Sequence, residues 1–367
     1  MLEFTLKQQG KIQRLTNKTF HLDERYKDGY FSAAYFLKTE EIIREYHPDN
    51  TVTVQFFQRR HSVLCGIDEA IALIHTFAKN PQDLRIEALN DGDLIEPLEP
   101  VLKITGRYQD FGFLEGPIDG ILARRTSVAS NCKRIIEAAK GAKVIFFGDR
   151  DDDPRNHPGD GYAAYIGGIR SFCTDAMGEW IGYKGMGTMP HALIVMFKMN
   201  LLEAAKAFHE KFNQDNLIVL VDSNNDVITD SLKVADYFKD ELYGVRIDTS
   251  KALVDKYFER ENITDPTIEK NGVNVTLVKA LRKALDEHGH QHVKIVVSSG
   301  FDEEKCKMFS DGNAPVDFYG VGSSLLKVTT SFTGDCVKID GVNMAKVGRH
   351  EMFSERLKKV PYPIVEK

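Results

Sequence analysis

Small and polar residues follow two apolar runs late in the sequence, in "VKIVVSSGFDE" and "VDFYGVGSS". Glycine lets backbone N–H groups approach a ligand closely, and a helix that starts just afterwards favours an anion. One such turn alone indicates only a tight connection, and two together leave a phosphate site and a pair of tight turns equally favoured. Neither turn is a GxGxxG or Walker sequence, so no Rossmann or P-loop nucleotide site is predicted. The candidate phosphate-binding residues are Ser298, Ser299, Gly300, Gly320, Gly322 and Ser323.

Two aspartates and an arginine also follow or end apolar runs. Asp222 and Asp248 are placed to accept hydrogen bonds from sugar hydroxyls or to hold Mg²⁺. Arg246 lies two residues before Asp248, so both side chains point to the same side of a strand. The pair is either a structural ion pair or a fork for a carboxylate or phosphate.

The stretch "RDDDPRNHPGDG" contains three adjacent aspartates. Three adjacent aspartates cannot all face one ion from a regular strand, and the prolines and glycines predict a loop. We therefore expect Asp151 to Asp153 to be solvated acids. Arg150, just after Phe147 at the end of an apolar run, is the better functional candidate.

A single histidine lies in "GMGTMPHALIVMF", after a glycine-rich turn and a proline. His191 could cap or pack a helix start, bind a metal, or act as a nucleophile. The residue pattern alone leaves these three roles open.

A repeated unit of apolar run, polar tip and helix predicts the elements that carry these residues. Because such alternation is typical of a parallel α/β sheet, the polar tips should meet at the carboxyl ends of the strands. The number of units favours a barrel over a doubly wound sheet. The predicted strands lie in "KVIFFGDR", "LIVLVDSNND", "GVRIDTS", "VKIVVSSGFD" and "VDFYGVGSS", and the helices in "LLEAAKAFHEKF", "SLKVADYFKDEL" and "TLVKALRKALDEHG".

The first third of the chain has a different pattern. "TVTVQFFQRR" alternates and predicts a strand, "GIDEAIALIHTFAKN" predicts a helix, and further short strands follow. A long helix is predicted after Leu114, in "EGPIDGILARRTSVASNCKRIIEAAKG". We expect a first domain over 1–113, a second over 114–330, and a segment over 331–367 that returns to the first.

Composition excludes several classes of function. A length of 367 residues suits two or three domains, and a net charge of -6 argues against a nucleic-acid partner. Five scattered cysteines form no CxxC pair, which argues against a disulfide framework or a zinc knuckle. We see no signal-peptide pattern and no apolar run of transmembrane length, so we expect a cytoplasmic protein.

The ordered motifs resemble the type II phosphoribosyltransferases of the nicotinate branch, in its compact microbial form. The resemblance implies an irregular, TIM-like parallel α/β barrel with an N-terminal α/β sandwich that the C-terminal tail completes. It also implies a homodimer with the active site between subunits. The matching stretches are "LEGPIDGILARRTSVASN", "FFGDR", "AAYIGG", "GTMPHALI", "VDSNND", "GVRIDTS", "SSGFDE" and "GVGSSLL", with a weaker match at "DGYFSAAYFLKT".

The resemblance implies that nicotinate is joined to phosphoribosyl pyrophosphate, giving nicotinate mononucleotide and pyrophosphate in NAD biosynthesis. Mg²⁺ is the expected metal and ATP the expected co-substrate, in a ligase-like coupling through a phosphorylated His191. Thr188 would orient that histidine. Asp248 would lie by the ribose hydroxyls, and Asp222 would support ribose or Mg²⁺.

The same resemblance assigns the ligand contacts. Phe147 would stack on the pyridine ring, Arg150 and Arg246 would reach ligand anions, and Tyr35 would contact the base from the partner subunit. The usual aspartate two residues before that tyrosine is Ala33 here, and the Asp151–Asp160 region is longer than in the family. The remaining candidates for substrate binding are Ser250, Cys173 and Thr174.

Three alternatives stay open. Quinolinate would need several more basic residues, and nicotinamide enzymes carry an aspartate near the positions of Cys173 and Thr174, where Asp175 is one residue away. From another class, the chain could be a non-catalytic sensor of a sugar phosphate or nucleotide.

Overall fold

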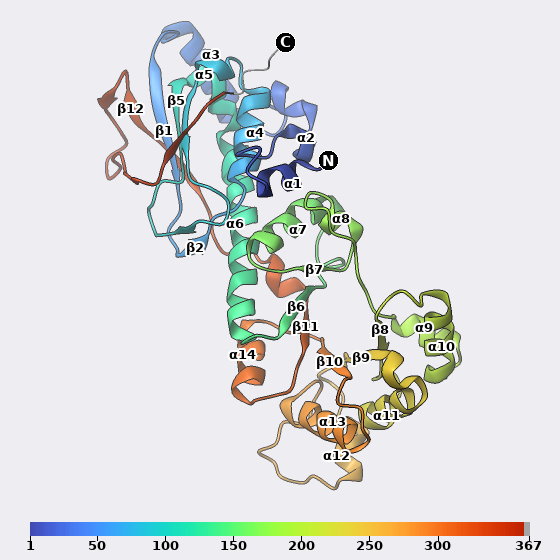
Figure 1. Ribbon diagram of the computed structural model, residues 1–367. Coiled ribbons are helices and arrows are strands. Elements are labelled where there is room, and N and C mark those ends of the chain that lie inside the picture. Colours follow the sequence, from blue (N-terminus) through green and yellow to red (C-terminus); the bar gives the residue numbers. More distant parts are fainter. Residues whose placement is uncertain (363–367) are drawn as a thin grey trace.

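The chain folds into two lobes joined by one long helix (Figure 1). The computed structural model describes residues 1–362. The N-terminal lobe is built on a six-stranded sheet in the order β13-β12-β1-β5-β3-β14, and the parallel-sheet lobe on six strands in the order β7-β6-β11-β10-β9-β8. Helix α6 (Glu115–Ala138) runs along both lobes. At about 1.5 Å per residue, its 24 residues are long enough to reach both cores.

The sheet of the N-terminal lobe is antiparallel and contains strands from both ends of the chain. The strand expected in "TVTVQFFQRR" is confirmed as β1, which pairs with β5 and β12. Strand β14 pairs with β3, so the last part of the chain adds strands at both edges of this sheet. The strands are β1 (Thr51–Phe57), β3 (Arg85–Ala88), β5 (Leu102–Arg107), β12 (Thr333–Ile339), β13 (Val342–Asn343) and β14 (Lys358–Val360), with a separate pair β2 (Ser62–Val63) and β4 (Leu94–Ile95).

The expected amphipathic helix of this lobe is confirmed as α4. Its apolar residues pack into one core with β1 and β5, because they recur at helical spacing. Asp68 at its start is fully buried and accepts hydrogen bonds from Arg14 Nη1 at 3.0 Å and the Leu15 amide at 2.9 Å. These contacts fix the N-terminal segment on the lobe. The helices are α1 (Glu3–Gln8), α2 (Asn17–Phe20), α3 (Ala34–Tyr46), α4 (Ile67–Phe77) and α5 (Tyr108–Phe111).

The second sheet contains all five strands that the sequence predicted, together with one that it missed. The missed strand, β7, has only two residues, too few to give an alternating pattern. All neighbouring strands are parallel, so their carboxyl ends lie along one edge. The strands are β6 (Lys143–Phe146), β7 (Ser171–Phe172), β8 (Leu217–Leu220), β9 (Leu242–Ile247), β10 (Lys294–Val297) and β11 (Phe318–Val321).

The expected closed barrel is not formed within residues 1–362. Strands β7 and β8 are the two edges of the sheet and do not pair with each other there, so the sheet is a curled half-barrel. The chain between them forms helices and supplies no further strand that could bridge the gap. The mixed α/β class and the parallel sheet are as predicted.

Four helices of this lobe begin at an Asn or Asp whose side chain accepts a backbone N–H three residues later. Such caps satisfy free N–H groups at a helix start and therefore define where these helices begin. The capping residues are Asn200, Asp226, Asn274 and Asp302. The helices are α7 (His157–Ile166), α8 (Asp175–Gly178), α9 (His191–Met196), α10 (Leu201–Lys211), α11 (Val227–Phe238), α12 (Lys256–Arg260), α13 (Val275–Glu287) and α14 (Glu303–Asp311).

None of the helices described is both long and apolar enough to cross a membrane.

Candidate active site

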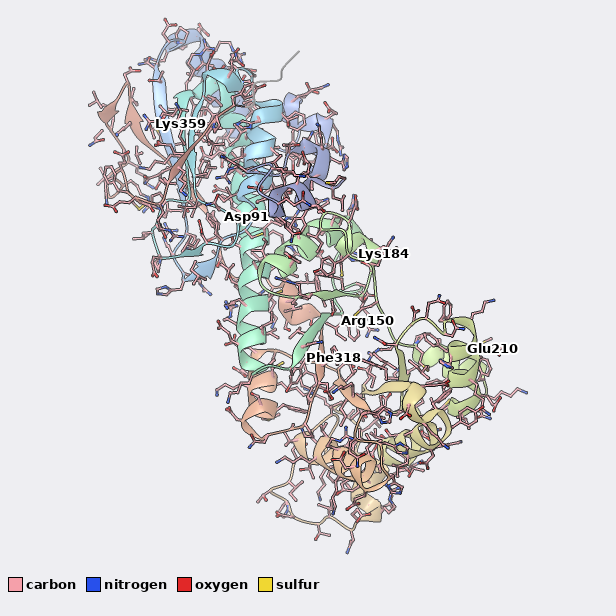
Figure 2. All side chains as sticks on the ribbon, viewed as in Figure 1. Asp91, Arg150, Lys184, Glu210, Phe318 and Lys359 are labelled. Carbon is pink, nitrogen blue, oxygen red and sulfur yellow. The ribbon has the colours of Figure 1, made fainter. Side chains whose placement is uncertain are left out.

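A cavity of about 330 Å³ lies at the carboxyl ends of β6, β9, β10 and β11. It brings together most of the candidate residues, which come from tips more than 150 positions apart in the sequence. Figure 2 shows one of them, Arg150, in the middle of the molecule. The predicted residues that line the cavity are Phe147, Arg150, Arg246, Asp248, Ser250, Ser298, Ser299, Gly300, Gly320, Gly322 and Ser323; Asp151 and Phe301 line it as well.

Arg246 is held in the cavity wall by three hydrogen bonds. Its Nη2 donates to Asp248 Oδ2 at 3.0 Å, its Nε to Ser298 Oγ at 2.9 Å, and its Nη1 to Thr188 Oγ1 at 3.1 Å. Ser298 Oγ in turn donates to Asp248 Oδ1 at 2.7 Å. The ion pair considered from the sequence is therefore present, and the same guanidinium also faces the cavity.

Phe147 completes this wall. The Arg246 guanidinium carbon lies 4.9 Å from the centre of the Phe147 ring, within the range of a cation–π contact. A Cβ atom on Gly320 would lie 2.5 Å from that ring, so only glycine leaves room for it at this position. A Cβ on Gly322 would overlap the carboxylate of Asp151. The two glycines therefore allow the segment after β6 to pack directly on the β11 tip.

The tip after β10 has an unusual backbone. Ser299 has φ of +81° and Gly300 has φ of +67°, in the region that favours glycine. A non-glycine residue with positive φ stores backbone strain, which is concentrated at functional sites. Lys305 Nζ donates to the Ser299 carbonyl at 2.9 Å and lies 4.3 Å from the centre of the Phe301 ring. Burial there lowers the pKa of Lys305.

His191 is the first residue of α9 and lies outside the residues that line the cavity. Its Nε2 lies 3.0 Å from Asp222 Oδ1, and its side chain is 47% exposed while that of Asp222 is 6% exposed. Burial raises the pKa of Asp222; His191 opposes the rise, and the charge of Asp248 adds to it. A carboxylate in this position fixes the ring and leaves Nδ1 free.

Thr188, His191 and Asp222 lie next to the cavity without lining it, and three further candidates are not brought to it in this chain. Tyr35 is 64% exposed on α3, in the N-terminal lobe. Cys173 Sγ donates to Asp149 Oδ1 at 3.4 Å, and burial raises the pKa of this thiol to about 12. Thr174 Oγ1 caps α8 by accepting the Met177 amide at 3.2 Å.

The expectation that Asp151 to Asp153 are solvated acids holds for Asp151, which is exposed, and for Asp153, whose side chain is 40% exposed, and is wrong for Asp152. Asp152 forms an ion pair with Arg124, and its side chain is 24% exposed. Asp151 lines the cavity, and Asp153 pairs with Arg155 within the same loop. Arg124 lies on α6, 28 positions away from Asp152, so the loop sequence could not reveal this partner. Asp151 and Phe301 directly follow predicted residues, which was the only sequence signal for them.

Metal binding in the described part of the chain does not rest on a dedicated cage. No group of three or more His, Cys, Asp or Glu side chains among residues 1–362 is arranged to hold a metal. Asp222 and Asp248 provide two carboxylates near each other at the strand ends. Mg²⁺ is commonly bound by one or two carboxylates together with substrate phosphates, so these residues fit that ion.

Comparison with known proteins agrees with this geometry. The family model described as "Quinolinate phosphoribosyl transferase, N-terminal domain" matches residues 30–126. A nicotinate phosphoribosyltransferase of Mycobacterium tuberculosis is 28% identical over 272 residues, which cover 71% of this chain and 55% of the relative. One of Bacillus subtilis is 22% identical over 304 residues, covering 74% and 56%. The chain thus spans about half the length of these relatives.

Solved structures share the fold. Nicotinate-nucleotide pyrophosphorylase from Pyrococcus furiosus superimposes with a TM-score of 0.77 and 29% identity, over 93% of this chain and 85% of that one. Human nicotinic acid phosphoribosyltransferase gives a TM-score of 0.68 with 16% identity, over 88% and 77%. Both similarities extend through the two lobes.

Proposed function

We propose that this chain is a type II phosphoribosyltransferase and, within that family, a nicotinate phosphoribosyltransferase; its similarity to the proteins named above supports this. It joins nicotinate to phosphoribosyl pyrophosphate and releases pyrophosphate. The observation that carries the proposal is that the small residues after β10 and β11, two arginines and an aromatic ring all line the same cavity.

The cavity supplies what the reaction requires. Departure of pyrophosphate leaves positive charge on the ribose, so the protein must hold two anions and orient the base. Ser299, Gly300 and Gly322 offer a backbone cradle for the 5′-phosphate, and Asp248 faces the ribose hydroxyls. Phe147 stacks on the pyridine ring, while Arg246 and Arg150 attract its carboxylate and the donor phosphates.

We propose that ATP drives the reaction by phosphorylating His191. With Nε2 against the buried Asp222, the free Nδ1 can attack a γ-phosphate, and the carboxylate stabilises the ring as it gains charge. Thr188 is hydrogen-bonded to Arg246, so the turn before His191 is linked to the cavity wall. Mg²⁺, bound by Asp222 or Asp248, would supply charge neutralisation for pyrophosphate.

We also propose a homodimer in which Tyr35 reaches the partner's cavity. Tyr30 and Tyr35 are both more than 60% exposed in the N-terminal lobe, as expected for aromatic residues that meet another surface. Sedimentation of the active enzyme tests this, because a fully active monomer would rule it out.

The substrate is the decisive test, because the family model and the relatives carry different substrate names. The protein should be incubated with phosphoribosyl pyrophosphate, Mg²⁺ and each of nicotinate, nicotinamide and quinolinate, with and without ATP. We expect nicotinate to react at least about tenfold faster than nicotinamide, a preference of about 1.4 kcal/mol. Faster reaction of the amide would overturn the proposal, and release of CO₂ from quinolinate would assign that substrate instead.

A further inference from the structure

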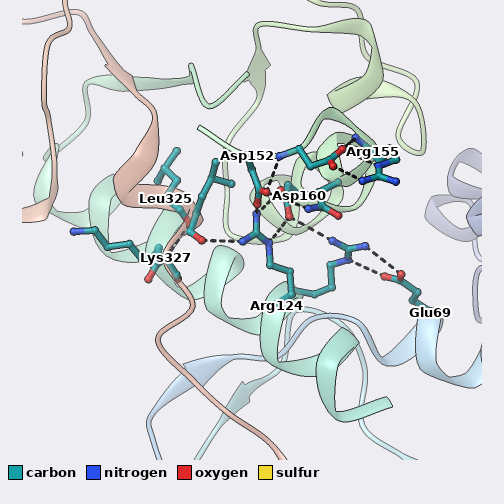
Figure 3. A network of polar contacts seen from close by, with 12 residues as sticks. Glu69, Arg124, Asp152, Arg155, Asp160, Leu325 and Lys327 are labelled. Atoms are coloured by element: carbon teal, nitrogen blue, oxygen red, sulfur yellow. Dashed lines mark hydrogen bonds and ion pairs between the residues drawn. The ribbon is translucent and has the colours of Figure 1, made fainter. Parts of the chain in front are cut away.

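A network of ion pairs and hydrogen bonds centres on Arg124 of α6 (Figure 3). Arg124 is bidentate to Asp160, with Nε at 2.9 Å from Oδ1 and Nη2 at 2.7 Å from Oδ2. Its Nη2 also contacts Asp152, and its Nη1 donates to the Leu326 carbonyl at 3.0 Å. One guanidinium thus binds the loop after β6 at Asp152, the nearby helix α7 at Asp160 and, far from both in the sequence, the turn after β11 at Leu326.

Two of these segments lie side by side at the cavity, because they follow the neighbouring strands β6 and β11. The β6 loop, residues 147–156, contributes Phe147, Arg150 and Asp151, while the β11 turn, residues 322–327, contributes Gly322 and Ser323. Asp152 is the neighbour of Asp151, and Leu326 follows Ser323 by three residues. Arg124 contacts both segments just outside the cavity, so it links them beyond the last backbone hydrogen bond between β6 and β11, from the Phe147 amide to the Val321 carbonyl.

The rest of the α6 face supports the same arrangement. Asn131 Nδ2 donates to the Leu325 and Lys327 carbonyls at 2.9 and 2.8 Å. Asp160 is 1% exposed and also accepts from Arg125 Nη1 at 3.3 Å, and Arg125 is bidentate to Glu69 on α4. A buried carboxylate that binds two arginines holds their side chains in place, because breaking either ion pair would leave a buried charge without a partner.

We propose that Arg124 is a positioning residue that holds the β6 loop and the β11 turn at the separation that both substrates need, with Asp152 as its loop-side partner. This inference rests on the proposed function. Neither Asp152 nor Arg124 lines the cavity, whereas Asp151, the chain neighbour of Asp152, does. Burial opposes ionisation of Asp152, but its hydrogen bond from the Asp153 amide and the charge of Arg124 together lower its pKa.

The adjacent Asp153 provides a matched control. Asp152 and Asp153 lie in the same loop, and each pairs with an arginine, but Asp153 pairs only with the exposed Arg155. Asp152→Asn keeps the Oδ1 that accepts the Asp153 amide at 2.7 Å and loses the charge that Arg124 binds. Asp153→Asn keeps its helix-capping oxygen and loses only a surface ion pair.

Arg282 is the corresponding control for Arg124. It also binds three partners, Asp286 and the His290 and Val293 carbonyls, and its side chain is 18% exposed. These contacts lie before the start of β10, at the end of the sheet opposite the cavity. Arg282→Lys should therefore lower stability as Arg124→Lys does, with no effect on catalysis.

The experiment combines hydrogen exchange with kinetics on the four variants. Arg124→Lys should speed amide exchange in both the β6 loop and the β11 turn, about fivefold or more. The reason is that one ammonium group cannot make all the hydrogen bonds that the planar guanidinium makes to Asp152, Asp160 and the Leu326 carbonyl. Asp152→Asn should loosen the β6 loop alone. Both should lower kcat/KM for phosphoribosyl pyrophosphate by about tenfold, since small misplacements of reactants are costly. Their double variant should lose less than the product of the two losses, because the residues act as one unit.

The proposal is overturned if Arg124→Lys or Asp152→Asn keeps kcat/KM within twofold of wild type, or behaves like its control variant. It is also overturned if exchange in the β11 turn is the same in Arg124→Lys as in Arg282→Lys. The exchange measurement needs no substrate. If the wild-type chain forms no nicotinate mononucleotide, the proposed function fails, while exchange still decides whether Arg124 joins the two segments.

Discussion

Two polar clusters of this molecule differ in whether their carboxylates have a cationic partner. In the cavity, Arg246, Asp248 and Ser298 form a closed set of hydrogen bonds. At the start of α6, Glu115 and Asp119 are one turn apart on the helix and largely buried. Neither has an arginine or lysine in an ion pair within the described chain.

The consequence of this difference is visible in the pKa values. Burial and the nearby acids raise the pKa of Glu115 to about 8, and burial raises that of Asp119 to about 7. Asp335 beside them has Arg349 Nε at 2.8 Å, in an ion pair. A buried charge with an opposite partner stays ionised and can orient a ligand, whereas a buried carboxyl without a cation is held in its neutral form and affects stability.

The largest effect is expected for Arg246→Ala. It removes three hydrogen bonds and leaves Asp248 in the cavity wall without its cation. We expect kcat/KM to fall roughly a thousandfold, about 4 kcal/mol, since removal of one partner of a buried pair is strongly unfavourable. Steady-state kinetics with a melting curve measures this. A fall in kcat/KM of less than tenfold would show that the hydrogen bonds among Arg246, Asp248 and Ser298 have only a structural role.

Gly320→Ala should have the next largest effect. The new methyl would lie 2.5 Å from the Phe147 ring and 3.1 Å from Ser298 Cβ, so the ring must move. We expect the KM for nicotinate to rise by roughly tenfold to a hundredfold, because stacking and orientation are lost together. Gly120→Ala on α6 is the control, because its methyl meets nothing within 4 Å and should stabilise the helix. An unchanged KM in Gly320→Ala contradicts the placement of Phe147.

His191→Asn distinguishes phosphorylation of His191 from a purely structural role of its side chain. If His191 is phosphorylated, ATP labels the wild type in an acid-labile, base-stable bond, and the variant loses both the label and the ATP stimulation. A slower ATP-independent reaction should remain, because the cavity contacts are untouched. The structure already excludes a capping role, because Pro190 is the N-cap of α9; if His191 only holds the Asp222 carboxylate by a hydrogen bond, asparagine would serve about equally well. Full ATP-coupled activity in the variant would falsify the nucleophile role.

Glu115→Gln should have the smallest effect, and only on stability. The folded-state pKa of Glu115 lies near 8, above its ordinary value of 4.5, so the folded state holds a proton that the unfolded state loses. Stability from this group is therefore full below about pH 4.5 and is lost as the pH rises towards 8. Melting temperatures between pH 5 and pH 8 should fall more in wild type than in Glu115→Gln. Parallel curves for the two proteins would show that Glu115 ionises freely in the fold.

The sequence determined the parts of the site that depend on local pattern. Side chains alternate along a strand, so Arg246 and Asp248 had to share a face, and carboxyl ends of parallel strands had to meet. The small residues of the β10 and β11 tips were identified for the same reason. Even the glycines were recognisable, although their physical cause, contact with Phe147 and Asp151, was not.

Only the tertiary structure decided the rest. A parallel sheet and a barrel have the same strand pattern, and closure depends on whether the two edge strands meet; β7 and β8 do not. The partner of Asp222 is 31 positions away, and the Leu326 carbonyl that Arg124 binds is 202 positions away. Contacts at such separations leave no periodic signal, because they depend on how whole elements pack. For that reason Asp152 resembled a solvated acid in the sequence and became part of the cavity's support in the fold.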